Sequence, residues 1–156
     1  MVQEDPETWN KALDDLDHYL DLEGPFDGII GVSQGAALAA TFLTSVMFRK
    51  TTKRDLKTVI LFSCEVVVDP TALLHGAVQP LKLREHELVN IASAHFRTSA
   101  DMDLCIGSEQ ARLLFTRGLR EELMYEGGPG IPKTMSRTLA NKMAQIMRRA
   151  IYSAGD

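Results

Sequence analysis

Apolar residues recur along this chain at two different spacings, and each spacing predicts one kind of element. From Pro6 to about Leu22 they return every three or four positions, which predicts a helix with one buried face. Asp5 suits the N-cap of this helix, because its carboxylate can accept hydrogen bonds from the first free backbone N–H groups. A proline such as Pro6 fits the first helical position.

A short, nearly continuous apolar run at residues 57–64 predicts a strand buried on both faces of a parallel sheet. We expect three further strands, at residues 26–32, 89–97 and 121–125. Between them the helical spacing returns, and we expect helices at residues 34–48, 107–119 and 134–152. The methionine-rich stripe that starts at Met135 is interpreted as core packing, because flexible thioethers fill irregular gaps. Residues 49–56 are predicted to be a polar loop, and residues 65–88 follow neither spacing.

This alternation predicts an α/β fold with a parallel sheet of about four strands flanked by helices, in one domain over residues 1–156. A net charge of −4 gives no indication of a nucleic-acid partner. No apolar run approaches 18 residues, so we expect neither a membrane span nor a membrane partner. Cys64 and Cys105 form no C-x-x-C pair and no signal peptide is evident, so we expect a cytoplasmic protein without a structural disulfide.

The pentapeptide Gly31-Val32-Ser33-Gln34-Gly35 connects a predicted strand to a predicted helix. In this context G-x-S-x-G is typical of the nucleophile elbow of an α/β-hydrolase, a tight turn that raises the serine hydroxyl above the end of the sheet. We therefore expect Ser33 to be the nucleophile and the N–H of Gln34 to contact the oxyanion. The two flanking glycines are expected to remove Cβ atoms that would clash in the turn.

The seventeen residues from Gly24 to Ala40 closely resemble the elbow of the FSH family of serine hydrolases, which are small fungal α/β-hydrolases. A weaker, collinear likeness runs from about residue 8 to about residue 133. The resemblance implies an esterase or thioesterase that acts on small acyl esters or thioesters in secondary metabolism, with no cofactor. It also places Asp101 at the position of the triad acid.

Two departures from the family pattern bear on activity. The catalytic histidine of a Gly-Gly-His-x-x-Pro loop corresponds here to Pro129, which has no basic nitrogen. The strands that begin the family's fold, together with a loop that donates a second oxyanion N–H, have no counterpart in this chain. Without a general base a serine hydroxyl is a poor nucleophile, so His75 and His86 are the candidate replacement bases. No spacing typical of metal ligands is found, and no metal site is expected.

Three hypotheses of function remain open at this point. The first is an FSH-type serine hydrolase with a small acyl substrate. The second is a non-hydrolytic descendant that binds, cyclises or isomerises an apolar small molecule, as Pro129 would allow. The third is an interaction module without chemistry. Because residues 26–32 would form an apolar sheet edge, we also expect a homodimer that pairs or covers this edge.

Overall fold

The computed structural model describes residues 5–48, 56–84, 88–99 and 102–154. It contains four strands: β1 (Gly28–Val32), β2 (Thr58–Phe62), β3 (Ala92–Thr98) and β4 (Arg120–Tyr125). The α-helices are α1 (Pro6–Glu23), α2 (Gln34–Phe48), α3 (Pro70–Leu74), α4 (Met102–Leu114) and α5 (Arg137–Ser153). A 3₁₀ turn, η2, covers Arg117–Leu119.

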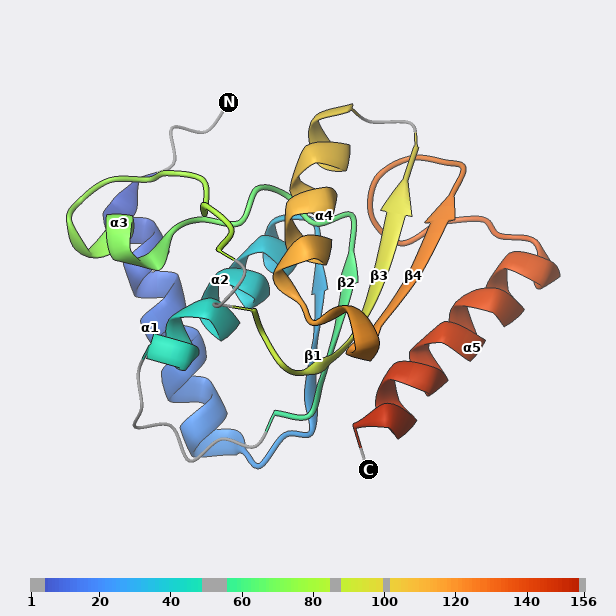
Figure 1. Ribbon diagram of the computed structural model, residues 1–156, viewed down its shortest axis with the longest axis horizontal. Helices are drawn as coiled ribbons and strands as arrows, with labels where there is room; N and C mark the ends of the chain where they lie inside the picture. Colours follow the sequence, from blue (N-terminus) through green and yellow to red (C-terminus); the bar gives the residue numbers. More distant parts are fainter. Residues whose placement is uncertain (1–4, 49–55, 85–87, 100–101, 155–156) are drawn as a thin grey trace.

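The four strands form one parallel sheet in the order β1-β2-β3-β4. All four arrowheads in Figure 1 therefore point to the same edge, which we call the carboxyl edge. In the register of the sheet, Val32 lies beside Phe62, and Phe62 lies beside Phe96. The predicted α/β fold is confirmed, with the number of strands that the sequence indicates.

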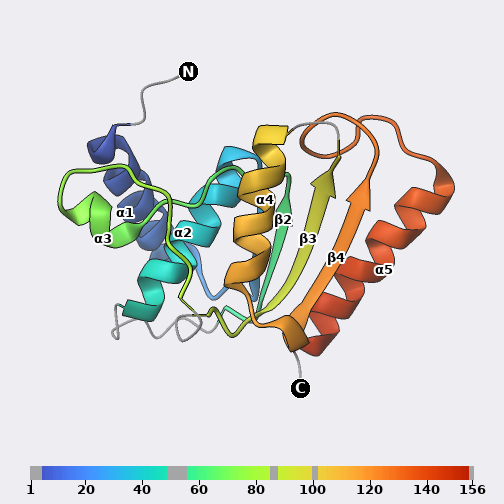
Figure 2. The same cartoon turned by 45° about the horizontal axis from the view of Figure 1, so that its top comes forward.

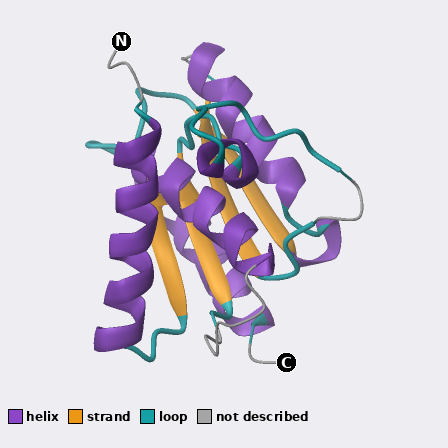
Figure 3. Cartoon of the chain, turned by 90° about the vertical axis from the view of Figure 1, so that its left-hand side faces the viewer, coloured by secondary structure: helices purple, strands orange, loops and turns teal. Residues whose placement is uncertain are grey.

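Helices cover the two faces of the sheet unequally. Figures 1 and 2 show α5 alone on one face, and α2 and α4 on the other with α1 and α3 outside them. Alternate residues of a strand point to opposite faces, and β2 shows this clearly: Leu61 joins the core under α2, whereas Ile60 and Phe62 join the core under α5. Figure 3 shows α1 beside the β1 end of the sheet.

The sheet leaves β1 at an edge, as the sequence predicts. Within the described residues β1 pairs only with β2. Helix α5 packs on β2, β3 and β4, so the β1 side chains that point to this face are uncovered. Ile30 is 65% exposed and Val32 is 37% exposed.

The helix predicted at residues 107–119 is displaced in the structure, where α4 runs from Met102 to Leu114. Gly107, the first residue of the predicted range, lies inside α4. An added Cβ there would come within 2.6 Å of the Glu65 carbonyl oxygen and 2.7 Å of that of Cys64. This glycine is needed because the helix contacts the chain after β2 directly. The helix ends at Leu114 because Phe115 then forms a parallel bridge with Val89.

Other sequence expectations hold with small shifts. Helix α1 begins at Pro6 and Asp5 caps it, accepting from the N–H groups of Glu7 and Thr8. Helix α5 starts at Arg137 after the N-cap Ser136, so Met135 precedes the helix and is 40% exposed rather than in the core. Residues 65–88 contain α3 in their described part. None of the helices in the described ranges combines the length and apolar character required to cross a bilayer.

Candidate active site

Ser33 occupies a tight turn between β1 and α2. Its φ is +54°, a left-handed conformation that serine rarely adopts and that costs about 1–3 kcal/mol. The turn is held at both ends, because the Ser33 N–H donates to the Phe62 carbonyl at 2.9 Å while the Ser33 carbonyl accepts from Ala36 at 3.1 Å and Ala37 at 3.2 Å. The backbone thus has the geometry that the G-x-S-x-G motif predicts.

The two glycines of the motif have different roles. A Cβ on Gly31 would lie 2.6 Å from the Ala36 Cα and 2.8 Å from the Gly35 carbonyl oxygen, so only glycine lets α2 begin over β1 here. A Cβ on Gly35 would meet no atom within 4 Å among the described residues. The expectation of a steric requirement is correct for Gly31 and wrong for Gly35, because Gly35 faces open space beside the start of α2.

The start of α2 offers free donors next to Ser33. In the described part of the chain we find no hydrogen bond from the N–H of Gln34, as expected for a group in the first turn of a helix. Such N–H groups, aided by the helix dipole, stabilise negative charge. The geometry is therefore compatible with the predicted contact between this N–H and an oxyanion.

The hydroxyl of Ser33 has a carboxylate partner. Its Oγ donates to Oε1 of Glu65 at 2.7 Å. The two residues are also linked through the backbone, because the Glu65 N–H donates to the Ser33 carbonyl at 3.4 Å. Glu65 is partly buried.

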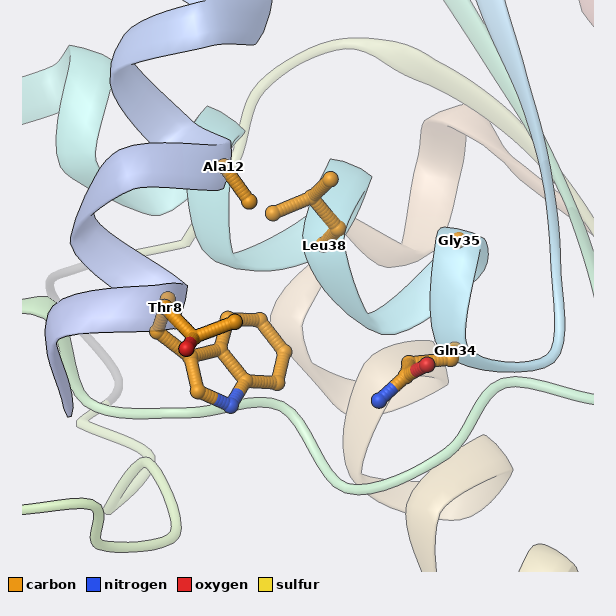
Figure 4. A pocket seen from close by; sticks show the side chains of 6 residues that line it. Thr8, Ala12, Gln34, Gly35 and Leu38 are labelled. Carbon is orange, nitrogen blue, oxygen red and sulfur yellow. The ribbon is translucent and has the colours of Figure 1, made fainter. Parts of the chain in front are cut away.

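A pocket opens beside the elbow, between α1 and the first turns of α2. Its volume is about 310 Å³, and its walls are Thr8, Trp9, Ala12, Gln34, Gly35 and Leu38. Figure 4 shows Ala12 of α1 and Leu38 of α2 pointing toward one another, with Gln34 at the start of α2. Most of the lining is apolar, so the pocket suits a small apolar group close to the free N–H of Gln34.

The loop that contains Pro129 is fixed at the carboxyl edge. The Gly130 N–H donates to Oγ of Ser63 at 2.9 Å, and the hydroxyl of Tyr125 donates to the Gly130 carbonyl. An added Cβ on Gly130 would lie 3.6 Å from a methyl group of Val32, so the loop reaches the strand that precedes Ser33. Pro129 itself is exposed.

The structure does not bring His75 to Ser33. His75 follows α3, its side chain is exposed, and its Nδ1 lies 2.8 Å from the Thr71 carbonyl oxygen. No hydrogen bond joins it to Ser33 within the described residues. The other candidate base, His86, and the candidate acid, Asp101, lie outside the residues that the structure describes.

His95 and Cys64 are poorly suited to direct catalysis. His95 lies on β3 with 2% of its surface exposed and with Nε2 3.0 Å from Ser93 Oγ. Burial, reinforced by the guanidinium groups of Arg120, Arg97 and Arg112, lowers the pKa of His95 to about 3. Burial and the nearby Glu65 carboxylate raise the pKa of the Cys64 thiol to about 12, which disfavours the reactive thiolate.

Neither Glu65 nor Ser63 was identified from the sequence as a site residue. No motif in the sequence marks them; the register that pairs Val32 with Phe62 places the residues after β2 beside those after β1. Ser63 even has the same unusual conformation as Ser33, with a φ of +44°. In the described parts of the chain, no group of three or more His, Cys, Asp or Glu residues is arranged to hold a metal ion.

Comparisons with known proteins identify the family of the chain and the fold that it shares with solved structures. The sequence model of a family described as serine hydrolase (FSH1) matches residues 2–140. The chain is 28% identical to "Esterase FPY3" of Fusarium mangiferae over 145 residues, which cover 92% of this chain and 65% of that protein. It is 50% identical to "Hydrolase phiM" of a fungal species over 42 residues, or 27% of this chain and 20% of that protein. The chain thus spans less than two thirds of the length of these curated relatives.

Solved structures support the fold. An esterase of Pyrobaculum calidifontis superposes with a TM-score of 0.58 at 16% identity, over 94% of this chain and 60% of that one. The esterase domain of a Rhodothermus marinus protein gives a TM-score of 0.51 at 12% identity, over 91% and 64% of the two chains. At these identities the similarity concerns the fold, which is that of α/β-hydrolase esterases.

Proposed function

The chain belongs to the serine hydrolase (FSH1) family, and from this premise we propose that it hydrolyses small acyl esters or thioesters with Ser33 as the nucleophile. The observation that carries the proposal is the conformation of Ser33. A serine held at a φ of +54° between a strand and a helix, with its Oγ bonded to a carboxylate, has the strained geometry of a nucleophile elbow. The strain presents the hydroxyl above the carboxyl edge of the sheet.

The neighbouring groups supply two further requirements of acyl transfer. When Ser33 Oγ attacks an acyl carbon, the carbonyl oxygen becomes negatively charged. The N–H of Gln34 is free to stabilise this charge, and one such donor is typically worth a factor of about 10²–10³ in rate. The pocket between α1 and α2 provides an apolar surface for the acyl chain or the leaving group. In this proposal Asp101 keeps the role of the acid, as the family resemblance implies.

The thioester activity and a role in secondary metabolism rest on the family resemblance alone. The similarity to "Esterase FPY3" supports the ester as the first substrate class to test. A cytoplasmic location is also part of the proposal. The buried thiol of Cys64 is free, which fits a reducing compartment.

A direct test compares wild type with Ser33→Ala on p-nitrophenyl butyrate and on a butyryl thioester. We expect hydrolysis by wild type and a loss of about 10³-fold or more in kcat for Ser33→Ala, because the nucleophile is removed. Ser99→Ala is the matched control, since Ser99 is an exposed serine after β3 at the same edge. Equal rates in wild type and Ser33→Ala would contradict the proposal.

A second candidate function is the binding of an apolar small molecule without hydrolysis. It is favoured by Pro129, which the family resemblance places at the position of the catalytic histidine, and by the apolar pocket beside Gln34. The non-hydrolysable ether p-nitrophenyl butyl ether separates the two candidates. Binding of this ether by wild type and Ser33→Ala alike, with no ester hydrolysis by either, would favour the second function over the first.

A further inference from the structure

We propose that Glu65 is the general base that activates Ser33, so that a serine–glutamate pair takes the place of the serine–histidine pair. This inference rests on the proposed function and adds a catalytic residue to it. The observation that carries it is the hydrogen bond from Ser33 Oγ to Glu65 Oε1, at 2.7 Å. A general base must lie within about 2.6–3.2 Å of the atom whose proton it removes, and Glu65 meets this condition.

In this hydrogen bond Ser33 is the donor and Glu65 the acceptor. An ionised carboxylate only accepts hydrogen bonds, so the hydroxyl proton of Ser33 must point at Glu65. The lone pairs of Ser33 Oγ are then free to face a substrate.

Glu65 is held in place by contacts of its own backbone. On one side Gly107 of α4 lies so close that any added Cβ would come within 2.6 Å of the Glu65 carbonyl oxygen. The Cys64 thiol donates to this same oxygen at 3.2 Å, and the Ser108 hydroxyl donates to the Cys64 carbonyl at 3.2 Å. The segment after β2 therefore cannot shift without moving α4.

The residues that follow Glu65 are fixed as well. The side chain of Gln110 accepts from the Val67 N–H at 2.9 Å and donates to the Val67 carbonyl at 3.3 Å. The Val68 N–H donates to Thr41 Oγ1 of α2 at 3.1 Å. Two helices thus anchor the chain on both sides of the carboxylate, which is the kind of support that keeps a catalytic group in productive geometry.

The alternatives within the described residues are less suitable. His75 bonds to its own helix, and His95 is buried beneath α4 against Phe115. The thiol of Cys64 donates to a carbonyl group and is buried. Pro129 carries no proton acceptor on its side chain. Glu65 is the described side chain that contacts the reacting hydroxyl.

The reaction balances with Glu65 as the proton carrier. As Ser33 Oγ bonds to the acyl carbon, its proton passes to Glu65 Oε1 and the carbonyl electron pair moves onto oxygen. When the tetrahedral adduct collapses, the bond to the leaving group breaks and this group leaves with the proton from Glu65. A water molecule then attacks the acyl-enzyme and gives its proton to Glu65, which returns it to Ser33 Oγ as the carboxylic acid departs.

The test compares Glu65→Gln with wild type, by kcat/KM for p-nitrophenyl butyrate and by the rate at which a fluorophosphonate labels Ser33. Glutamine keeps the shape of the side chain and cannot accept the proton as a base. We expect both rates to fall by about 10²–10⁴-fold, the usual contribution of a general base. Glu126→Gln is the matched control, because Glu126 is an exposed carboxylate after β4 at the same edge, and its rates should be unchanged.

Each outcome decides between the two proposals. If wild type hydrolyses the ester and a folded Glu65→Gln is equally fast, the assignment of Glu65 is overturned and the esterase function stands. If wild type neither hydrolyses esters nor labels at Ser33, both are overturned. If Glu65→Gln does not melt cooperatively, the test uses Glu65→Ala with and without added formate. Labelling of Ser33 that formate restores supports a base at this position. Full labelling of Ser33 without formate overturns the assignment of Glu65.

Discussion

At the residue scale, the conformation of Ser33 depends on the hydrogen bonds of its backbone and not on its side chain alone. The motif predicts the turn, and the structure has it, with the Ser33 N–H bonded to the Phe62 carbonyl at 2.9 Å. The partner of the hydroxyl could not be predicted in the same way. Glu65 is 32 residues away in sequence, and its contact with Ser33 exists only because β2 pairs in parallel beside β1.

The two glycines of the motif give a prediction at this scale. Gly31→Ala should lower the free energy of unfolding by about 1–3 kcal/mol, the usual cost of forcing an atom into a packed site. Gly35→Ala is the matched control, because an added Cβ there meets open space. It should leave stability unchanged or raise it by up to about 1 kcal/mol, since alanine favours helix. Chemical denaturation measures both, and equal losses would contradict this account of the turn.

At the element scale, the strands were easier to predict than the helix boundaries. The predicted ranges overlap all four strands, and the signal is strongest for β2, whose five residues are all buried. The helix predicted at residues 107–119 is displaced from α4, which runs from Met102 to Leu114 and contains Gly107. The residue is a contact point between α4 and the chain after β2, and the sequence alone does not show which segment a helix will touch.

The pocket between α1 and α2 gives a prediction for substrate choice. Ala12→Leu adds three carbon atoms beside Leu38, where Figure 4 shows the two side chains converging. The smaller pocket should disfavour the longer acyl chain. The ratio of kcat/KM for p-nitrophenyl butyrate to kcat/KM for p-nitrophenyl acetate should therefore fall by about 10-fold, an effect that one or two methylenes can have in an apolar pocket.

The control for this substitution is Lys11→Leu, one residue earlier on the exposed side of α1. It adds a leucine to the same helix without lining the pocket. A ratio that is the same in Ala12→Leu, Lys11→Leu and wild type would show that the acyl chain does not enter this pocket.

At the scale of the whole molecule, the uncovered β1 edge is the feature that remains without a partner in the described residues. The homodimer predicted from the sequence would pair or cover this edge. Light scattering should then give about twice the mass of one chain for wild type, and Ile30→Lys should shift it toward the monomer. A lysine on an edge strand opposes pairing with another strand.

Ile151→Lys is the control for the dimer, because Ile151 is also an exposed isoleucine, 50% exposed against 65% for Ile30, but lies on α5. It should leave the mass unchanged. A wild type that is monomeric at all concentrations, or an Ile30→Lys variant that stays dimeric, would exclude dimerisation through β1.

The central claim is that the elbow presents Ser33 as a reactive nucleophile. The most direct measurement is peptide mass spectrometry after treatment of the folded chain with a fluorophosphonate. We predict one phosphonyl adduct per chain, on Ser33, which Ser99→Ala retains and Ser33→Ala loses. An unmodified Ser33, or an adduct on a different residue, would contradict the claim.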